Sequence, residues 1–477
     1  MSDEPLSRAY NGRDLIEWGF EPAKWFPEAI AAANRLAAEG AREAEIRAAV
    51  AGLAPPPPPP TLPLRDQDAV SFHRNIEAET PAEAANVEAV EATMRELMRT
   101  PTVVAGAVMP DACPAGGLGT IPVGGVVATE NAIHPGFHSA DICCSMAFSL
   151  LGDVDPTAVL DAAERLTHFG GGGRAAGEQI RPPESVMARF DANPLLKSQQ
   201  GAAVAHFATQ GDGNHFLFVG RLRSNGRIAM VTHHGSRKPG ALLYKAGMKI
   251  AEAHRAKRAP EVLKQNAWIE ADSAEGETYW DALQAIRAWT KANHFAIHDR
   301  VISALGLAGP EERFWNEHNF VFRRGDRFYH GKGATPAWAD FAEDSVGLTL
   351  IPLNMAEPVL ITRGLDAANA LGFAPHGAGR NRSRGAHMKS LAGRSEAEVL
   401  RAETHGLDAR FFCGIPDLPE LPSAYKDAAS VTAQIERFGL AEIVDQVDPI
   451  GSIMAGEWAR PFRDKRNKPQ RGGKRSL

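Results

Sequence analysis

The chain has 477 residues and a formal net charge of −6, with 44% hydrophobic and 23% charged residues. This composition is typical of a soluble globular protein with a substantial core, and the small negative charge excludes a globally basic nucleic-acid binder. The sequence carries no secretion signal and no apolar run long enough to span a bilayer, and the adjacent thiols Cys143 and Cys144 are poor candidates for a disulfide framework. We therefore expect a cytoplasmic protein without a membrane partner.

The first part of the chain predicts a small helical module over residues 1–54, because residues 13–54 carry the apolar spacing of helices. Six consecutive prolines, Pro55 to Pro60, forbid helix and favour extended polyproline, so we expect a linker over residues 55–63. Residues 77–99 predict a further helix.

Short β-branched runs separated by glycine-rich turns begin at residue 102 and alternate with longer helical patterns at 242–257 and 278–305. The turn Arg324-Gly325-Asp326 predicts a hairpin between Phe320–Arg323 and Arg327–His330. This mixture predicts the α+β class, with a single large catalytic domain of mixed sheets over residues 64–458. The predicted strands are Thr102–Val108, Val123–Ala128, Phe216–Val219, Ile228–Thr232, Leu348–Ile351 and Val359–Thr362.

The last segment, residues 459–477, contains eight basic residues and one acid, Asp464, and few apolar residues. Such a composition predicts a disordered basic tail. The tail has two interpretations, a solubilising segment or an arm that attracts the phosphates of RNA.

Several histidines follow or precede predicted strands, where polar side chains often point into a shared cleft. A single histidine in such a place is usually structural, but Asp141 and Cys144 precede the set and offer carboxylate and thiolate. Imidazole, carboxylate and thiolate together are the ligands of a transition metal. The spacing leaves open whether Cys143 is the ligand in place of Cys144. The histidines of this group are His215, His233 and His318.

His376 lies in Pro375-His376-Gly377-Ala378-Gly379-Arg380, where the glycines allow close backbone approach to a ligand. Arg380, Arg382 and Arg384 can clamp phosphate. A histidine beside such a clamp can attack an α-phosphorus and form a phosphoramidate. The alternative is a glycine-rich turn with surface arginines.

These segments, in this order, resemble the RtcB family of RNA ligases, which join 3′-phosphate and 5′-hydroxyl ends. The resemblance covers about residues 102 to 456, and its most specific motif is His-Gly-Ala-Gly-Arg. The matching segments are Met109–Asp111, Asp141–Cys144, Gly213–Phe216, His233–Arg237, His318-Asn319, Lys332–Thr335, His376–Arg380 with Ser383-Arg384, and Ala424–Asp427.

The resemblance implies two manganese ions, one held by Asp141, Cys144 and His215 and the other by Cys144, His233 and His318. It also implies that His376 is the catalytic nucleophile, which takes GMP from GTP. The RNA partner would carry a 3′-phosphate or 2′,3′-cyclic phosphate on one end and a 5′-hydroxyl on the other. The residues expected to contact the nucleotide are Asn214, His215, Arg237, His318, Asn319, Asn354, Met355, His376, Gly377, Ala378, Gly379 and Arg380.

The chain departs from the family pattern at the positions that contact the guanine base. Phe218 stands where the family usually has a glutamate, Pro358 stands in place of a serine, and no lysine aligns with the usual C-terminal one. Losing a charged hydrogen bond to a base costs about 1.5–3 kcal/mol. The sequence therefore predicts a divergent paralogue with altered nucleotide preference or a specialised RNA target.

These residues are compatible with three hypotheses about the function of the chain. The first is an RNA ligase that uses manganese and a nucleotidylated His376. The second is a metal-dependent phosphodiesterase or phosphatase that opens cyclic phosphates and has lost ligation. The third is a non-enzymatic factor that binds RNA ends in a repair complex.

Overall fold

The computed structural model describes residues 9–55 and 60–457, and the chain divides into two compact units, Met1–Thr61 and Leu62–Leu477. The predicted basic tail, 459–477, and the middle of the predicted linker, 56–59, lie outside the described residues. None of the helices in the described ranges combines the length and apolarity needed to cross a membrane.

The first unit consists of α1 (Gly12–Glu17), α2 (Phe26–Ala38) and α3 (Glu43–Leu53). Asn11 caps α1 by accepting a hydrogen bond from the backbone N–H of Arg13 at 2.9 Å. The helices pack around a small apolar core that includes Leu15, Phe26 and Ile46. The helical prediction for this segment is confirmed.

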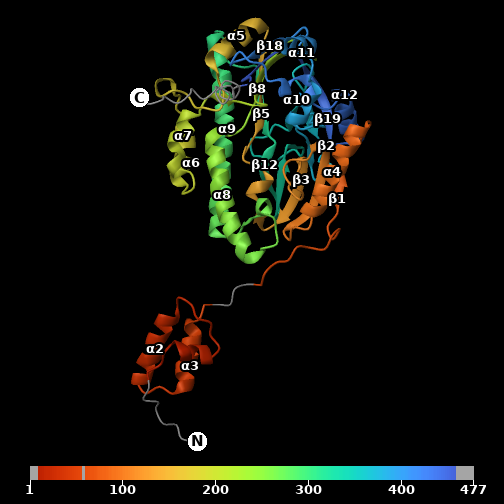
Figure 1. The fold of residues 1–477 in the computed structure, drawn as a ribbon. Helices are drawn as coiled ribbons and strands as arrows, with labels where there is room; N and C mark the ends of the chain where they lie inside the picture. The colour runs from red at the N-terminus through yellow and green to blue at the C-terminus, as the bar shows by residue number, and fades with distance from the viewer. Residues whose placement is uncertain (1–8, 56–59, 458–477) are drawn as a thin grey trace, which may run out of the picture. The chain divides into compact units, whose positions relative to one another are not determined.

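The second unit is built on two sheets, and the α+β expectation is confirmed (Figure 1). The larger sheet has the spatial order β11 (Glu312–Glu317), β5 (Ser145–Gly152), β9 (Ile228–His234), β8 (Phe216–Leu222), β19 (Ala441–Met454), β16 (Val359–Gly364) and β15 (Leu348–Pro352), and β18 (Asp408–Phe411) pairs with β19. The second sheet has the order β1 (Phe72–Arg74), β2 (Val103–Cys113), β3 (Val123–Glu130), β13 (Arg327–Lys332) and β12 (Asn319–Arg324). The pairs β1–β2 and β18–β19 are parallel, and the other pairs of these two sheets are antiparallel.

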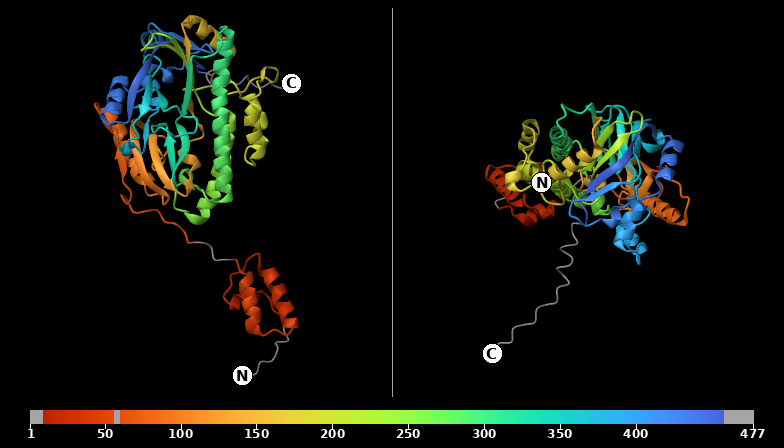
Figure 2. Two further views of the ribbon diagram at one scale, coloured as in Figure 1. Left: turned by 180° about the vertical axis from the view of Figure 1, so that it is seen from behind. Right: turned by 90° about the horizontal axis from the view of Figure 1, so that it is seen from above.

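Long helices cover these sheets. α8 (Arg237–Arg258) and α9 (Ala274–Ala304) lie on one side of the unit, and α4 (Pro81–Leu97) and α12 (Ala428–Arg437) lie on the other (Figures 1 and 2). α9 buries Tyr279 and Trp289 in the main core. The predicted helix 77–99 begins later, at Pro81, because Thr80 and Glu83 form a capping box there. Shorter helices are α5 (Pro156–Leu166), α6 (Glu184–Ala192), α7 (Gln200–Ala205), α10 (Arg384–Ser390) and α11 (Glu396–Glu403).

The antiparallel order of the larger sheet places four chain segments at one edge. β5 and β8 begin at this edge, whereas β9 and β11 end there, because neighbouring antiparallel strands run in opposite directions. The paired short strands β14 (Ala334–Pro336) and β17 (Phe373–Pro375) lie next to this edge, because the backbone N–H of Ala334 donates to the carbonyl oxygen of His318 at 3.0 Å. The remaining two-stranded pairs are β4 (Ala132–Ile133) with β10 (Ile269–Glu270) and β6 (His168–Phe169) with β7 (Thr209–Gly211).

Candidate functional site

The metal-ligand candidates lie where the four antiparallel strands meet the common edge. Cys144 directly precedes β5, and His215 directly precedes β8. His233 lies near the end of β9, opposite Met146 of β5. His318 directly follows β11, and its backbone N–H donates to the carbonyl oxygen of Cys144 at 2.8 Å. Residues up to 174 positions apart in sequence therefore meet because each one ends or begins a strand.

Two groups of possible ligands form at this edge, and both contain Cys144. One is Cys144, His233 and His318, and the other is Asp141, Cys144 and His215; within each group the ligand atoms lie within 4.8 Å of one another. The Sγ atom of Cys144 lies 3.2 Å from Nε2 of His233 and 3.7 Å from Nε2 of His215. Such a set of sulfur, imidazole nitrogen and carboxylate oxygen fits divalent transition metals.

The hydrogen bonding of the His233 ring and the pKa values of the ligand side chains bear on metal binding. Nδ1 of His233 lies 3.0 Å from the carbonyl oxygen of Asn214, so an N–H there leaves the Nε2 lone pair directed at the group. Desolvation lowers the pKa of His233 to about 3, with the charge of His215 adding to the effect, so its imidazole is neutral and able to coordinate. Burial, and next the charge of Asp141, raises the pKa of the Cys144 thiol, so a bound cation would be needed to hold it as thiolate.

The turn between Asp141 and β5 is locally strained. Cys143 has a φ of 58°, in the left-handed region that non-glycine residues seldom adopt, and its side chain lies in the main apolar core. The two ligand groups found among the described residues both contain Cys144, and neither contains Cys143. Gly235 approaches the same turn so closely that a Cβ atom would overlap the carboxylate of Asp141.

His376 lies beside this centre, directly after β17, with its ring centroid 5.0 Å from that of His318. Its Nδ1 is 2.6 Å from Oδ2 of Asp111, which also accepts from the backbone N–H of His376 at 3.2 Å. Lys426 is buried and donates from Nζ to the carbonyl oxygens of Pro110 and Ala112, each at 2.8 Å. A Cβ atom on Gly379 would overlap the backbone of Asp111, which explains the need for glycine there.

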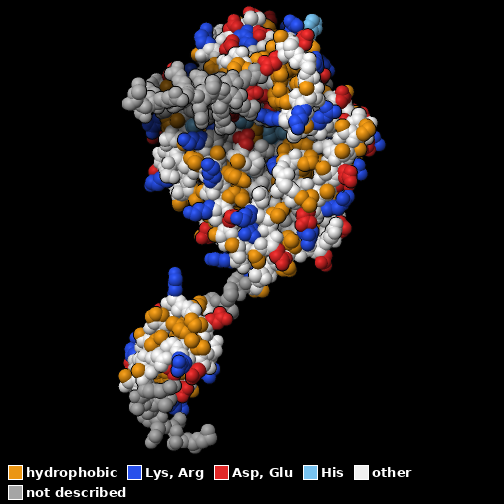
Figure 3. Space-filling model, viewed as in Figure 1, with side chains coloured by type: hydrophobic (Ala, Val, Ile, Leu, Met, Phe, Trp, Pro, Cys, Tyr) orange, Lys and Arg blue, Asp and Glu red, His pale blue; other side chains and the backbone are white. Residues whose placement is uncertain are grey.

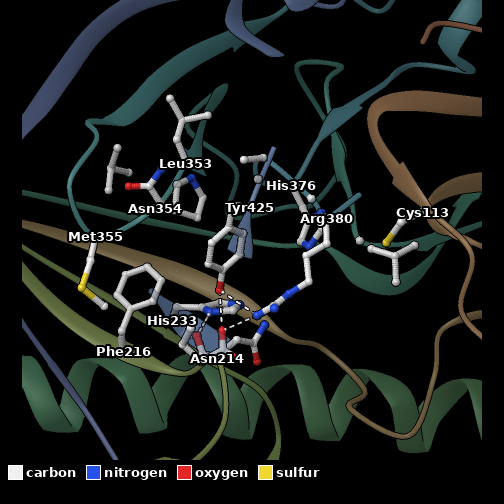
Figure 4. A pocket seen from close by; sticks show the side chains of 18 of the residues that line it. Cys113, Asn214, Phe216, His233, Leu353, Asn354, Met355, His376, Arg380 and Tyr425 are labelled. Carbon is white, nitrogen blue, oxygen red and sulfur yellow. Dashed lines mark hydrogen bonds and ion pairs between the residues drawn. The ribbon is translucent and has the colours of Figure 1, made fainter. Parts of the chain in front are cut away.

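A cavity of about 330 Å³ connects His233 and His376. Figure 4 shows side chains from several separate strands and loops directed into it, and Figure 3 shows histidine side chains in a hollow of this unit beside Lys and Arg side chains. Nine of the residues predicted to contact a nucleotide line the cavity, namely Asn214, Asn319, Asn354, Met355, His376, Gly377, Ala378, Gly379 and Arg380.

The other three predicted contacts lie elsewhere. His215 and His318 belong to the ligand groups described above and do not line the cavity. Arg237, at the start of α8, donates to the carbonyl oxygen of Gly170 at 2.8 Å and to Oγ1 of Thr209 at 3.4 Å. The guanidinium of Arg237 is therefore held by the protein and is absent from the cavity wall.

Two of the three arginines after His376, Arg380 and Arg384, are paired with a buried acid, Glu420. Arg380 forms an ion pair with Glu420 at 2.8 Å, and Arg384 and the hydroxyl of Tyr425 also bind this carboxylate. Figure 4 shows Arg380 and Tyr425 next to each other. The Arg380 guanidinium lies 4.6 Å from the centre of the Tyr425 ring. Glu420 is buried, with an exposed fraction of 1%. A carboxylate at such a sequence position carries no recognisable signal, because its role depends on a tertiary contact with the loop after His376.

A family model described as tRNA-splicing ligase RtcB matches residues 160–455, and the chain belongs to this family. The matched range contains His215, His233, His318 and His376, whereas Asp111, Asp141 and Cys144 precede it.

The chain is also similar to curated proteins named tRNA-splicing ligase RtcB from three organisms. It is 25% identical to the protein of Aeropyrum pernix over 301 residues, which are 55% of this chain and 62% of that protein. It is 25% identical to the protein of Thermococcus kodakarensis over 326 residues, 60% of this chain and 64% of that protein, and 23% identical to that of Nanoarchaeum equitans over 305 residues. The chain thus spans less than two thirds of the length of these relatives.

Proposed function

We propose that the protein is an RNA ligase that joins a 3′-phosphate or 2′,3′-cyclic-phosphate end to a 5′-hydroxyl end, using two manganese ions, GTP and a nucleotidylated His376. The proposal is carried by one observation: two ligand groups that share Cys144 lie next to a histidine whose Nδ1 is held by a buried carboxylate. Membership of the RtcB family supports the same reaction class.

The metal ligands would bind the ions, and residues that line the cavity would bind the phosphates. Asp141, Cys144 and His215 would hold one ion, and Cys144, His233 and His318 the other. When bound, the ions would supply positive charge to the phosphates and so lower the barrier at phosphorus. Asn214 and Asn319 line the cavity between His233 and His376, where their amides can orient phosphate oxygens.

His376 would be the nucleophile. Because Asp111 Oδ2 accepts from Nδ1–H, the lone pair of the imidazole is on Nε2, and this atom attacks the α-phosphorus of the triphosphate. The Nε2–P bond forms as the P–O bond to pyrophosphate breaks, and pyrophosphate leaves. The positive charge that develops on the ring is stabilised by Asp111, as in other acid–histidine pairs.

The RNA then takes part in three displacements at phosphorus. Water first opens a cyclic phosphate to a 3′-phosphate, whose oxygen attacks the phosphorus held on His376 and breaks the P–N bond. The 5′-hydroxyl of the other strand next attacks the activated 3′-phosphate, and GMP leaves.

The direct test is transfer of label from [α-³²P]GTP to the protein in the presence of Mn²⁺, followed by a denaturing gel. We expect labelled protein that is absent in His376→Ala, and joined product when RNA with the two ends is added. Label that persists in His376→Ala would refute His376 as the nucleophile.

A second candidate is a metal-dependent phosphodiesterase that opens cyclic phosphates and does not ligate. One observation favours it: the two ligand groups are complete without any residue of the apolar part of the cavity. Cyclic-phosphate opening with Mn²⁺ alone, with no labelled protein and no joined RNA, would select this candidate over the ligase.

A further inference from the structure

The floor of the cavity changes from polar to apolar along the larger sheet. His233 of β9 lies opposite Phe216 of β8, and Phe216 lies opposite Met454 of β19. The next residues on the same face are Phe218 of β8 and Ser452 of β19, which are also paired. All five line the cavity, so its floor runs from a candidate metal ligand to two phenylalanines and a methionine.

Other residues at this end of the cavity are apolar as well, and two of them, Met355 and Val359, pack in the apolar clusters that contain Phe216, Phe218 and Met454. Leu353 and Met355, from the loop between β15 and β16, line the cavity together with Val359, and each has an exposed fraction of 8% or less. Figure 4 shows Phe216 and Met355 side by side, with Leu353 and Asn354 nearby. This half of the cavity offers flat and flexible apolar surface, which suits the stacking of an aromatic ring.

The polar groups at this end are neutral. Ser452 provides a hydroxyl that can donate or accept, and Asn354 provides an amide whose Oδ1 already accepts from the backbone N–H of Ala356 at 2.9 Å. Among the described residues that line the cavity, Glu420 is the one carboxylate, and Arg380, Arg384 and Tyr425 already bind it. A base at the apolar end would therefore meet no free carboxylate.

We infer that the apolar half of this cavity accepts the base of the nucleotide with little selectivity, so that His376 takes a nucleoside monophosphate from more than one ribonucleoside triphosphate. The inference rests on the proposed function. If His376 attacks a triphosphate whose phosphates lie toward the candidate metal ligands, the nucleoside is directed toward Phe216 and Phe218. Stacking on aromatic and apolar side chains tolerates every base, since each base has a π-face.

The expected selectivity follows from the kind of hydrogen bond available. A neutral hydroxyl or amide distinguishes bases by about tenfold or less, whereas a carboxylate that accepts from both N1–H and the N2 amino group of guanine would give about ten- to hundredfold. Phe218 lines the floor beside Ser452, so a glutamate at this position would place a carboxylate at this end of the cavity. We therefore assign the lack of selectivity among bases to Phe218.

The test compares the four α-³²P-labelled ribonucleoside triphosphates as donors, each with the full chain and Mn²⁺, with His376→Ala as the blank. We expect the second-order rate constants for labelling to lie within about tenfold of one another. A preference of more than tenfold for any one triphosphate would overturn the inference and leave the proposed ligase intact. No label from any triphosphate would contradict the proposed function itself, and the inference with it.

A pair of variants tests the role of Phe218. Phe218→Glu is expected to raise the ratio of GTP to ATP labelling by at least about tenfold, whereas the matched control Phe218→Leu keeps the wild-type ratio. Circular dichroism and thermal melting establish that both variants are folded. A folded Phe218→Glu with the wild-type ratio would contradict the assignment of this residue. Should Phe218→Glu not fold, the comparison of the four triphosphates on the wild-type chain still decides the inference.

Discussion

Oδ2 of Asp111 lies 2.6 Å from Nδ1 of His376 and also accepts from the backbone N–H of the same residue. One carboxylate oxygen thus fixes both the ring and the main chain of the proposed nucleophile. The acid lies on β2 of the second sheet, and the histidine directly follows the short strand β17.

Asp111→Asn tests this relationship. The amide can donate to Nδ1 and so favour the tautomer that carries its proton on Nε2, which removes the nucleophilic lone pair. We expect the rate of labelling from GTP to fall by roughly 100-fold or more, with a small change in nucleotide affinity. Asp366→Asn, which removes a surface partner of Arg324, is the matched control and should label at the wild-type rate. Equal rates for the two variants would rule out a positioning role for Asp111.

The number of manganese ions bound per chain tests whether the sulfur of Cys144 is shared by two metal sites. The wild-type chain is expected to bind two ions, His318→Ala about one, and Cys144→Ala nearly none, because Cys144 belongs to both ligand groups and His318 to one. The measurement is elemental analysis of protein equilibrated with Mn²⁺ and separated from free ion. His405→Ala changes an exposed histidine and should keep both ions. Two ions retained in Cys144→Ala would contradict the bridging arrangement.

Lys426→Met tests whether the buried ammonium of Lys426 stabilises the segment that contains Asp111. The variant removes the ammonium donor from the carbonyl oxygen of Pro110 and leaves that of Ala112 with Asn86 as its side-chain donor, and we expect the free energy of unfolding to fall by about 1–3 kcal/mol. Urea denaturation measures this change. Lys389→Met, at an exposed position of α10, should alter stability little. If both variants unfold at the same urea concentration, the buried ammonium contributes nothing to the segment.

Asp417→Asn tests a pH dependence. Burial raises the pKa of Asp417 from 3.8 to about 6, and the neighbouring charge of Glu420 adds to the shift. The folded protein therefore binds more protons than the unfolded chain between about pH 4 and pH 6, so the contribution of Asp417 to the free energy of unfolding falls as the pH rises through this range. We expect Asp417→Asn to be more stable than wild type by up to about 3 kcal/mol at pH 7 and similar to it below pH 4. Thermal melting at several pH values measures the difference, and a constant difference at all pH values would contradict the shift.

Regular elements with strong patterns were predictable from the sequence. The strand Ile228–Thr232 lies within β9, and the hairpin around Gly325 joins β12 and β13. The helical pattern 242–257 lies within α8, and the pattern 278–305 matches α9 up to its last residue, Ala304. Local alternation and helical spacing determine these elements, so no knowledge of distant contacts was required.

The strand β19, which lies between β8 and β16, was not predictable in this way. Asp445, Asp448 and Pro449 interrupt its apolar alternation, and the register shifts near Pro449, so the segment lacks the usual strand pattern. Yet β19 carries Ser452 and Met454 into the cavity. Glu420 was missed for a related reason, since only the folded chain brings it to Arg380. The family resemblance implied a nucleotide contact for Arg237, and in the structure its guanidinium donates to Gly170 and Thr209.

The presence of a single sulfur in both ligand groups has a consequence for how the protein would lose activity. Oxidation of Cys144 to a sulfinic or sulfonic acid would remove one ligand from each group in the same event. Damage by an oxidant would then convert fully competent molecules directly into inert ones, with no half-loaded population between them, and prior loading with cation would shield the thiol from attack.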